Sequence, residues 1–319
     1  RRPEEELTPF AKQPEGFVYG KAQHFATSKP LRGSAVALTV KSSDGRPTKI
    51  EGNSLFPGAN GGTDAFAQAA ILNLYDPDRA HRHTRGGNDC KIEAVRDALA
   101  EVAKSALAKH GEGLAFLVER SSSPSRARLQ KLISEKYPKS TWHAYESVDF
   151  TAADAAYSQA CGTPVHALVH LEKARRILSL DCDFIGSEQD AHRNIRGFAL
   201  GRKSADDGMN RLYVVESMMS LTGGNADHRL RVKPSEVLKV AAAVAAELGV
   251  SGVASPSGAF SAWAAAVAKD LKDAGKGAVV VAGYSQPPAV HALAAAINSV
   301  LGAVGSTVTL VQPTEPVAL

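Results

Sequence analysis

Residues 278–301 read AVVVAGYSQPPAVHALAAAINSVL, and this stretch decides the expected fold. Its first five residues are all apolar, which predicts a short strand that is buried on both faces. Pro287 and Pro288 follow a turn, and apolar residues then recur at helical spacing as far as residue 301. A buried strand that leads directly into an amphipathic helix is the repeating unit of a parallel α/β sheet.

The same alternation of strands and helices extends back along the chain to residue 88. Apolar runs predict further strands over 114–119, 141–145, 176–180, 211–216 and 307–311. Periodic segments predict helices over 92–106, 124–137, 191–202, 234–248 and 257–274. This pattern favours a Rossmann-like α/β fold with a parallel sheet covered on both faces. We expect the first four of these strands to form the central sheet, and strands 278–282 and 307–311 to belong to a second α/β unit.

The first part of the chain has a different character. Four prolines within residues 1–33 exclude a continuous helix, so we expect an extended arm with little regular structure. Alternating residues over 35–41, a turn at 43–45 and a return over 48–51 predict a β-hairpin. A loop rich in glycine and asparagine follows, and a short helix is expected over 64–74.

These patterns predict three regions. Residues 1–87 hold the arm, the hairpin and the loop, and residues 88–250 form the Rossmann-like domain. The sequence SGVASPSG at 251–258 is the best candidate for a linker, so residues 251–319 are expected to form the second segment.

Composition excludes several classes of protein. Charged residues make up 22% and hydrophobic residues 44% of the 319 residues, as in ordinary globular proteins. The net charge of +4 comes without any block of like charges, which argues against nucleic-acid binding. No apolar run reaches the roughly 18 residues of a membrane span. Three isolated cysteines without a C-x-x-C pair argue against an iron–sulfur cluster or structural zinc held by this chain.

Two catalytic motifs are absent or incomplete. No G-x-G-x-x-G follows a predicted strand, which argues against an ordinary nicotinamide or flavin dehydrogenase. Residues 283–287, GYSQP, lie between a strand and a helix as a hydrolase nucleophile elbow does. However, no aspartate follows Ser285, and His291 lies in the same predicted helix, so a triad cannot be assembled. We therefore interpret Ser285 as the cap of that helix.

Two groups of histidines could bind metal but have simpler explanations. His166 and His170 have the i,i+4 spacing of a metal clamp, yet the segment between them is β-prone and follows a proline. A structural role is the favoured interpretation for both. His81 and His83 lie among arginines in a basic stretch, which we interpret as a solvated or interface loop.

Acidic residues end two of the predicted parallel strands. Asp181 and Asp183 follow strand 176–180, and Glu216 ends strand 211–216. Ligands of open α/β sheets bind at this edge, so these carboxylates could hold Mg²⁺ or a ribose. They would repel a pyrophosphate, although Arg193 and Arg196 could partly compensate. Ordinary hydrogen bonding within the loops is the other interpretation.

Five segments taken together resemble a known family. They read GRPTKIEGN at 45–53, LYDPDR at 74–79, NRLYVVE at 210–216, GGNADHRLRVKPSE at 223–236 and GYSQPPAVHALAAAINSVLGAVG at 283–305. Their order resembles the molybdopterin oxidoreductase superfamily. More narrowly, it resembles the large iron–sulfur subunit of alternative complex III, a bacterial membrane quinol oxidoreductase, whose mature region begins much like residues 1–15. A departure lies at 54–57, SLFP, where that subunit usually has proline and histidine before the next proline.

The resemblance implies a molybdopterin-type domain that has lost its cofactor. No cysteine precedes Cys90, and Ser147, Ser158 and Cys161 lack the context of a metal ligand. The resemblance places the iron–sulfur clusters in a ferredoxin-like domain downstream. It implies a structural role beside a quinol-oxidising membrane subunit and a multihaem cytochrome c, at the periplasmic face of the bacterial inner membrane. The alternatives are a catalytic molybdopterin oxidoreductase with bound cofactor, and a binding module that uses a relic pocket near Asp181, Asp183 and Glu216.

Overall fold

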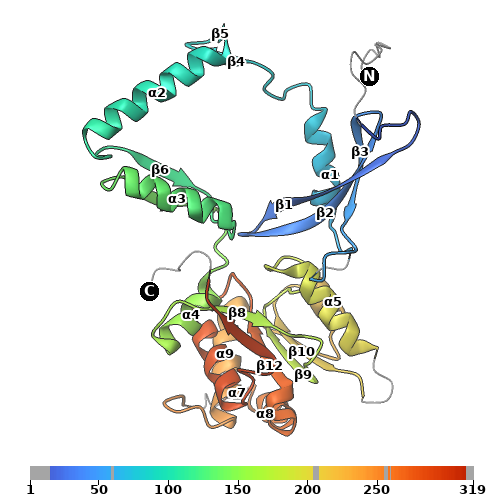
Figure 1. The fold of residues 1–319 in the computed structure, drawn as a ribbon. Helices are drawn as coiled ribbons and strands as arrows, with labels where there is room; N and C mark the ends of the chain where they lie inside the picture. The colour runs from blue at the N-terminus through green and yellow to red at the C-terminus, as the bar shows by residue number, and fades with distance from the viewer. Residues whose placement is uncertain (1–14, 59–60, 204–207, 255–257, 259, 314–319) are drawn as a thin grey trace. The chain divides into compact units, whose positions relative to one another are not determined.

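The computed structural model describes residues 15–58, 61–203, 208–254, 258 and 260–313. Within these limits the chain forms two compact units, and Figure 1 shows their elements in order. The smaller unit comprises the described residues of 1–29 and 36–80. The larger unit comprises the described residues of 30–35 and 81–319.

The smaller unit contains the predicted hairpin. Strands β2 (Ser34–Ser43) and β3 (Arg46–Gly52) pair antiparallel, and β1 (Gln23–Leu31) lies on the other side of β2. Asp44 and Gly45 form the turn between β2 and β3 with φ angles of 49° and 78°, the left-handed pair that tight hairpins require. Helix α1 (Ala65–Ala69) and the 3₁₀ helix η1 (Ala70–Leu74) follow, where a single short helix is predicted.

Strand β1 corrects the prediction of an irregular arm. Residues 23–31 form a regular strand, whereas residues 1–14 lie outside the described part of the chain. The prolines do not prevent this, because β1 is an edge strand. A proline such as Pro30 is tolerated at a sheet edge, where its missing N–H is not needed.

The larger unit begins with small elements that do not join the central sheet. Strands β4 (His83–Arg85) and β5 (Asn88–Cys90) form a short hairpin, and helix α2 (Ile92–Ala108) follows. Strands β6 (Ala115–Val118) and β7 (Thr141–Ala144) pair parallel with each other across helix α3 (Pro124–Lys136). The prediction that strands 114–119 and 141–145 belong to the central sheet is therefore wrong.

The central sheet has the order β11-β10-β9-β12 in the described part of the chain, with every neighbouring pair parallel. Its strands are β9 (Arg176–Leu180), β10 (Arg211–Glu216), β11 (His228–Arg231) and β12 (Ala278–Ala282). Strand β12 lies beside β9, so the expected second sheet does not form around residues 278–282. The other expected member of that sheet, β13 (Val308–Val311), pairs antiparallel with β8 (His166–Val169).

Helices cover both faces of this sheet, as predicted for the α/β class. Leu178, Leu180 and Val215 pack against α7 (Val237–Glu247), α8 (Ser261–Ala274) and α9 (Pro288–Val300). Ile177, Leu212 and Val214 face the opposite side, which α4 (Ala152–Cys161) and α5 (Ala191–Arg202) help to cover. Each such side chain contributes about 1.5–3 kcal/mol when fully buried. Short elements complete the unit: α6 (Leu221–Gly224) and the 3₁₀ helices η2 (Pro234–Glu236) and η3 (Gly275–Gly277).

Candidate functional site

The predicted acidic residues do meet at one edge of the central sheet. Register places Leu180 beside Val215 of β10 and Ala282 of β12, so these three strands end at the same level. Asp181 and Asp183 follow β9 directly, and Glu216 is the last residue of β10. This is the edge at which open parallel sheets bind ligands.

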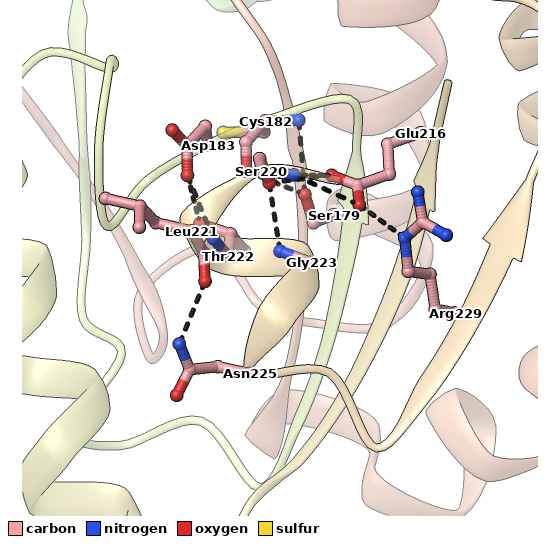
Figure 2. Close-up of polar contacts among 10 residues, drawn as sticks. All are labelled: Ser179, Cys182, Asp183, Glu216, Ser220, Leu221, Thr222, Gly223, Asn225 and Arg229. Atoms are coloured by element: carbon pink, nitrogen blue, oxygen red, sulfur yellow. Dashed lines mark hydrogen bonds and ion pairs between the residues drawn. The ribbon is translucent and has the colours of Figure 1, made fainter. Parts of the chain in front are cut away.

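Asp183 connects the loop after β9 to helix α6. Its Oδ1 accepts hydrogen bonds from the backbone N–H and from the hydroxyl of Thr222, both at 2.9 Å. Its Oδ2 accepts a third bond from the N–H of Ser187 at 3.2 Å. Figure 2 shows the side chain pointing at the first turn of α6. The carboxylate therefore joins two loops that come from neighbouring strands.

Glu216 is the most buried carboxylate of this edge. Its side chain is 3% exposed and accepts a bond of 2.6 Å from the Ser220 hydroxyl and one of 2.5 Å from Nε of Arg229, on β11 (Figure 2). The Ser220 hydroxyl also accepts the N–H of Gly223 at 2.9 Å, which caps the start of α6. We call Asp183, Glu216, Ser220, Thr222, Gly223 and Arg229 the strand-end network.

Position 223 must be glycine because the Glu216 carboxylate packs directly against its backbone. A Cβ atom at its position would lie 1.8 Å from Oε1 of Glu216, far inside any permitted contact. The next residue, Gly224, has no atom within 4 Å of such a Cβ. The strand-end network therefore requires a glycine at position 223 but has room for a side chain at position 224.

Asp181 joins the loops after β9 and β12. It has a φ of 53°, and its Oδ2 accepts a bond of 2.8 Å from Nε2 of Gln286. Burial raises the pKa of this carboxyl, and the charge of Glu216 adds to the shift. A Cβ at Gly283 would lie 1.9 Å from the backbone oxygen of Asp181, so the two loops are in direct backbone contact.

Glu188 is an acidic residue of this edge that the sequence did not reveal. Both of its carboxyl oxygens accept the N–H of Tyr284, at 3.1 and 3.3 Å. Burial raises the pKa of Glu188 to about 7, and the charges of Asp183 and Asp181 act in the same direction. The residue lies eight positions beyond the strand in an irregular loop, where neither periodicity nor spacing marks it.

The predicted histidine pair does not act as a unit. His166, the first residue of β8, binds Oδ2 of Asp154 through Nδ1 at 2.7 Å, and that bond raises its pKa. His170 binds Glu172 through Nδ1 at 3.1 Å and the Thr309 hydroxyl through Nε2 at 2.9 Å. Each ring is therefore held by its own partners, as in the structural interpretation. Among the described residues, no group of three or more potential ligands is placed to bind a metal ion.

The interpretation of Ser285 as a helix cap is wrong. Helix α9 begins after Pro287, and no side chain caps it. In the GYSQP turn, the side chain of Gln286 binds Asp181 and the N–H of Tyr284 donates to Glu188. Two consecutive prolines set the start of the helix without a cap, because proline fixes the φ angle that the first turn needs.

The remaining candidates are dispersed. Cys90 lies in β5, Cys161 ends α4 and Cys182 follows β9, and all three are free thiols. The Ser158 hydroxyl binds both backbone groups of Val165, which explains its burial, whereas Ser147 is exposed. In the basic loop, His83 lies on β4, and Arg82 pairs with Asp89 at 3.0 Å on the surface. A guanidinium nitrogen of Arg193 lies 3.4 Å from Nδ1 of His170.

The strand-end network does not fit an anionic dinucleotide. Backbone N–H groups at loop and helix starts are the usual ligands of a phosphate. Here those of Ser187, Ser220 and Thr222 donate to the chain's own carboxylates. Two unit charges of the same sign repel by about 4 kcal/mol at 4 Å near a protein surface. The acidic edge therefore opposes the pyrophosphate of a pterin dinucleotide.

Comparisons with known proteins agree with this architecture. No protein-family model matches the chain. It is 22% identical over 252 residues to the menaquinone reductase, molybdopterin-binding-like subunit of Nitratidesulfovibrio vulgaris. It also superposes on acetylene hydratase from Pelobacter acetylenicus with a TM-score of 0.58 and 12% identity over 86% of this chain. The chain therefore shares its fold with the matched part of acetylene hydratase.

Both of these proteins are much longer than the chain. The match covers 77% of this chain but 36% of the menaquinone reductase subunit, and the superposition covers 43% of the hydratase chain. Within the described residues, no helix has the length and apolar character needed to cross a bilayer.

Proposed function

We propose that this chain is the structural, non-catalytic molybdopterin-type part of an electron-transfer subunit in a membrane-bound, quinone-linked respiratory complex. The relative in Nitratidesulfovibrio vulgaris is named as a molybdopterin-binding-like subunit of a menaquinone reductase, which supports this class of complex. The motif order of the sequence favours alternative complex III as the particular kind.

The observation that carries the non-catalytic part of the proposal is the strand-end network. In a parallel α/β protein that holds a nucleotide, the polar groups at this edge bind the ligand. Here the carboxylates of Asp183 and Glu216 take the hydrogen bonds of α6 and Arg229, so the edge is satisfied by the chain itself. An edge of this kind suits a domain whose task is to hold neighbouring parts in place.

The proposed partners rest on the resemblance. They are a downstream ferredoxin-like domain that carries the iron–sulfur clusters, a quinol-oxidising membrane subunit and a multihaem cytochrome c. We place the protein at the periplasmic face of the bacterial inner membrane as a peripheral component. In this arrangement electrons pass through the clusters and haems, and the described residues position those groups.

The test is a metal and pterin analysis of the full protein purified with its native complex. We expect iron from the downstream domain and no stoichiometric molybdenum, tungsten or pterin, with a molybdopterin enzyme treated in parallel as the positive control. Stoichiometric molybdenum or tungsten would refute the non-catalytic assignment and favour a catalytic oxidoreductase. Purification without any membrane or haem-containing subunit would contradict the proposed partners.

A further inference from the structure

The parallel pair formed by β6 and β7 is an incomplete sheet by the usual standards of α/β proteins. Parallel strands are normally buried on both faces, and sheets of this kind have several strands. In the described part of the chain, this sheet consists of the two strands alone. One of its faces is open, because Ala115, Leu117, Thr141 and His143 are all exposed, Leu117 to 75%.

The helices next to this pair along the chain also expose apolar side chains. Helix α2 carries apolar residues at 92, 95, 99, 102 and 106, which share one face at helical spacing. Ala106 is its buried residue, whereas Leu99 is 65% and Val102 55% exposed. In α3, Leu129 and Leu132 are 49% and 47% exposed. A monomer rarely leaves so many apolar side chains together in water unless the surface binds a partner.

The composition of the two strands indicates which edge takes a further strand. Residues 114–118 read LAFLV, a continuous apolar run that is typical of a strand with neighbours on both sides. Strand β7 reads TWHA, and its polar residues Thr141 and His143 suit the edge of a sheet. Strand β6 therefore has the sequence of an inner strand, although it has one partner in this structure.

The hydrogen bonds identify the backbone groups at this free edge of β6. The N–H of Thr141 donates to the carbonyl of Leu114 at 3.0 Å, so residue 114 bonds toward β7. Bonding direction alternates along a parallel strand, and residues 116 and 118 therefore also face β7. The N–H groups of Ala115 and Leu117 point to the other side, where no described strand lies.

We propose that a parallel strand of the same protein, from outside residues 1–319, pairs with the free edge of β6, and that the segment carrying it covers the apolar face of α2. The comparisons leave room for such a segment, because the chain spans 36% of one matched protein and 43% of the other. A second copy of this chain fits less well, since an isologous contact would place two β6 strands antiparallel. The proposal rests on packing and not on the respiratory role, so the two hold or fail independently.

The first test is hydrogen exchange, read at single residues, on the full-length protein purified with its native complex. The amides of Ala115 and Leu117 should exchange as slowly as that of Phe116, because all three then lie inside a sheet. We expect their exchange to be about tenfold or more slower than that of the exposed turn at 86–87. Exchange of Ala115 and Leu117 at the rate of that turn would overturn the proposal.

The second test uses two matched valines on helices. Val102 of α2 and Val300 of α9 are 55% and 52% exposed in this structure. In the full-length protein, V102K should speed the exchange of residues 92–108 by about tenfold, whereas V300K should leave residues 288–300 unchanged. Equal effects of the two substitutions would contradict a covered α2. If V102K does not fold, the exchange of Ala115 and Leu117 in the unaltered protein decides the question.

The third test identifies the source of the covering segment. Leu117→p-benzoylphenylalanine in the full-length protein places a photoreactive group on the open face of β6. The expected product is a cross-link to a peptide of the same protein outside residues 1–319. Cross-links confined to residues 1–319, cross-links to another subunit, or no cross-link at all would each overturn the proposal.

Discussion

Replacing Glu216 by glutamine tests whether the strand-end carboxylates are structural. The substitution keeps the size of the side chain but removes the charge that faces Arg229, whose side chain is 21% exposed. Removing one partner of a buried ion pair generally costs about 3–5 kcal/mol. Glutamine still offers one oxygen as an acceptor, so we expect the lower end of this range, about 3 kcal/mol.

Urea unfolding at pH 7 measures this change. Trp263 is a suitable fluorescent reporter, because it packs edge-on against Tyr213 of the central sheet with ring centres 6.2 Å apart. With a urea dependence of about 3 kcal/mol per molar, the midpoint should fall by about 1 M. The matched control is E247Q, at an exposed position at the end of α7, which should change the stability by less than about 0.5 kcal/mol.

The result that refutes this reasoning is a neutral or stabilising effect of E216Q. Binding sites keep groups that are unfavourable for stability, so removing a carboxylate from a vacant ligand site usually leaves stability unchanged or raises it. A double-mutant cycle with R229M separates the pair from its surroundings. If the two residues act as a pair, their coupling should exceed about 1 kcal/mol. A coupling near zero would mean that Glu216 has another role.

Three further predictions follow from the packing and charges of the larger unit. G223A should destabilise the chain by about 2–4 kcal/mol in urea, because the added methyl group meets the buried carboxylate at 1.8 Å. G224A, where the methyl meets nothing within 4 Å, should not, and equal effects would contradict the packing argument. N298A should lower the free energy of unfolding by about 3–5 kcal/mol, because Asn298 binds both the N–H and the carbonyl of Val280 at 2.8 Å each. The Val280 amide should then exchange its hydrogen faster, and an unchanged exchange rate would contradict this prediction. The raised pKa of Glu188, about 7, means that the folded state holds its proton longer than the unfolded state, so stability should fall by roughly 3 kcal/mol or less from pH 4.5 to 7. E188Q should remove that part of the slope in urea titrations, and a slope that persists unchanged would assign it to other groups.

The sequence predicted most of the helices and strands, but not which strands pair with each other in the sheets. The apolar runs at 176–180, 211–216 and 278–282 are strands because local composition is sufficient to specify a buried strand. Their order is not local: β12 lies beside β9, about a hundred residues earlier, while β6 and β7 form a separate pair. Assigning neighbouring strands to one sheet is correct in about two-thirds of cases, and here it failed. Strand β11, HRLR, was missed because two arginines in four residues hide the apolar signal.

The sequence predicted where the acidic residues of the candidate site lie, but not which residues they bind. The rule for parallel sheets correctly placed Asp181, Asp183 and Glu216 at one edge. It could not show that Asp183 would bind Thr222, 39 residues later, or that Arg229 would come from β11. Such contacts depend on loop conformation, which periodicity does not encode. The environment of Glu188 depends on burial and was equally hidden.

The side chains of the short loop after β9 lie in two different environments, a polar one and an apolar one. Asp181 has a left-handed φ of 53° and Phe184 lies in a turn, so this segment does not continue the extended backbone of β9. Asp181 and Asp183 bind groups of the sheet edge, namely Gln286 and Thr222, whereas Cys182 and Phe184 belong to the apolar core on one face of the sheet. The order D-C-D-F at 181–184 therefore supplies polar partners to the sheet edge and apolar side chains to the core beneath it.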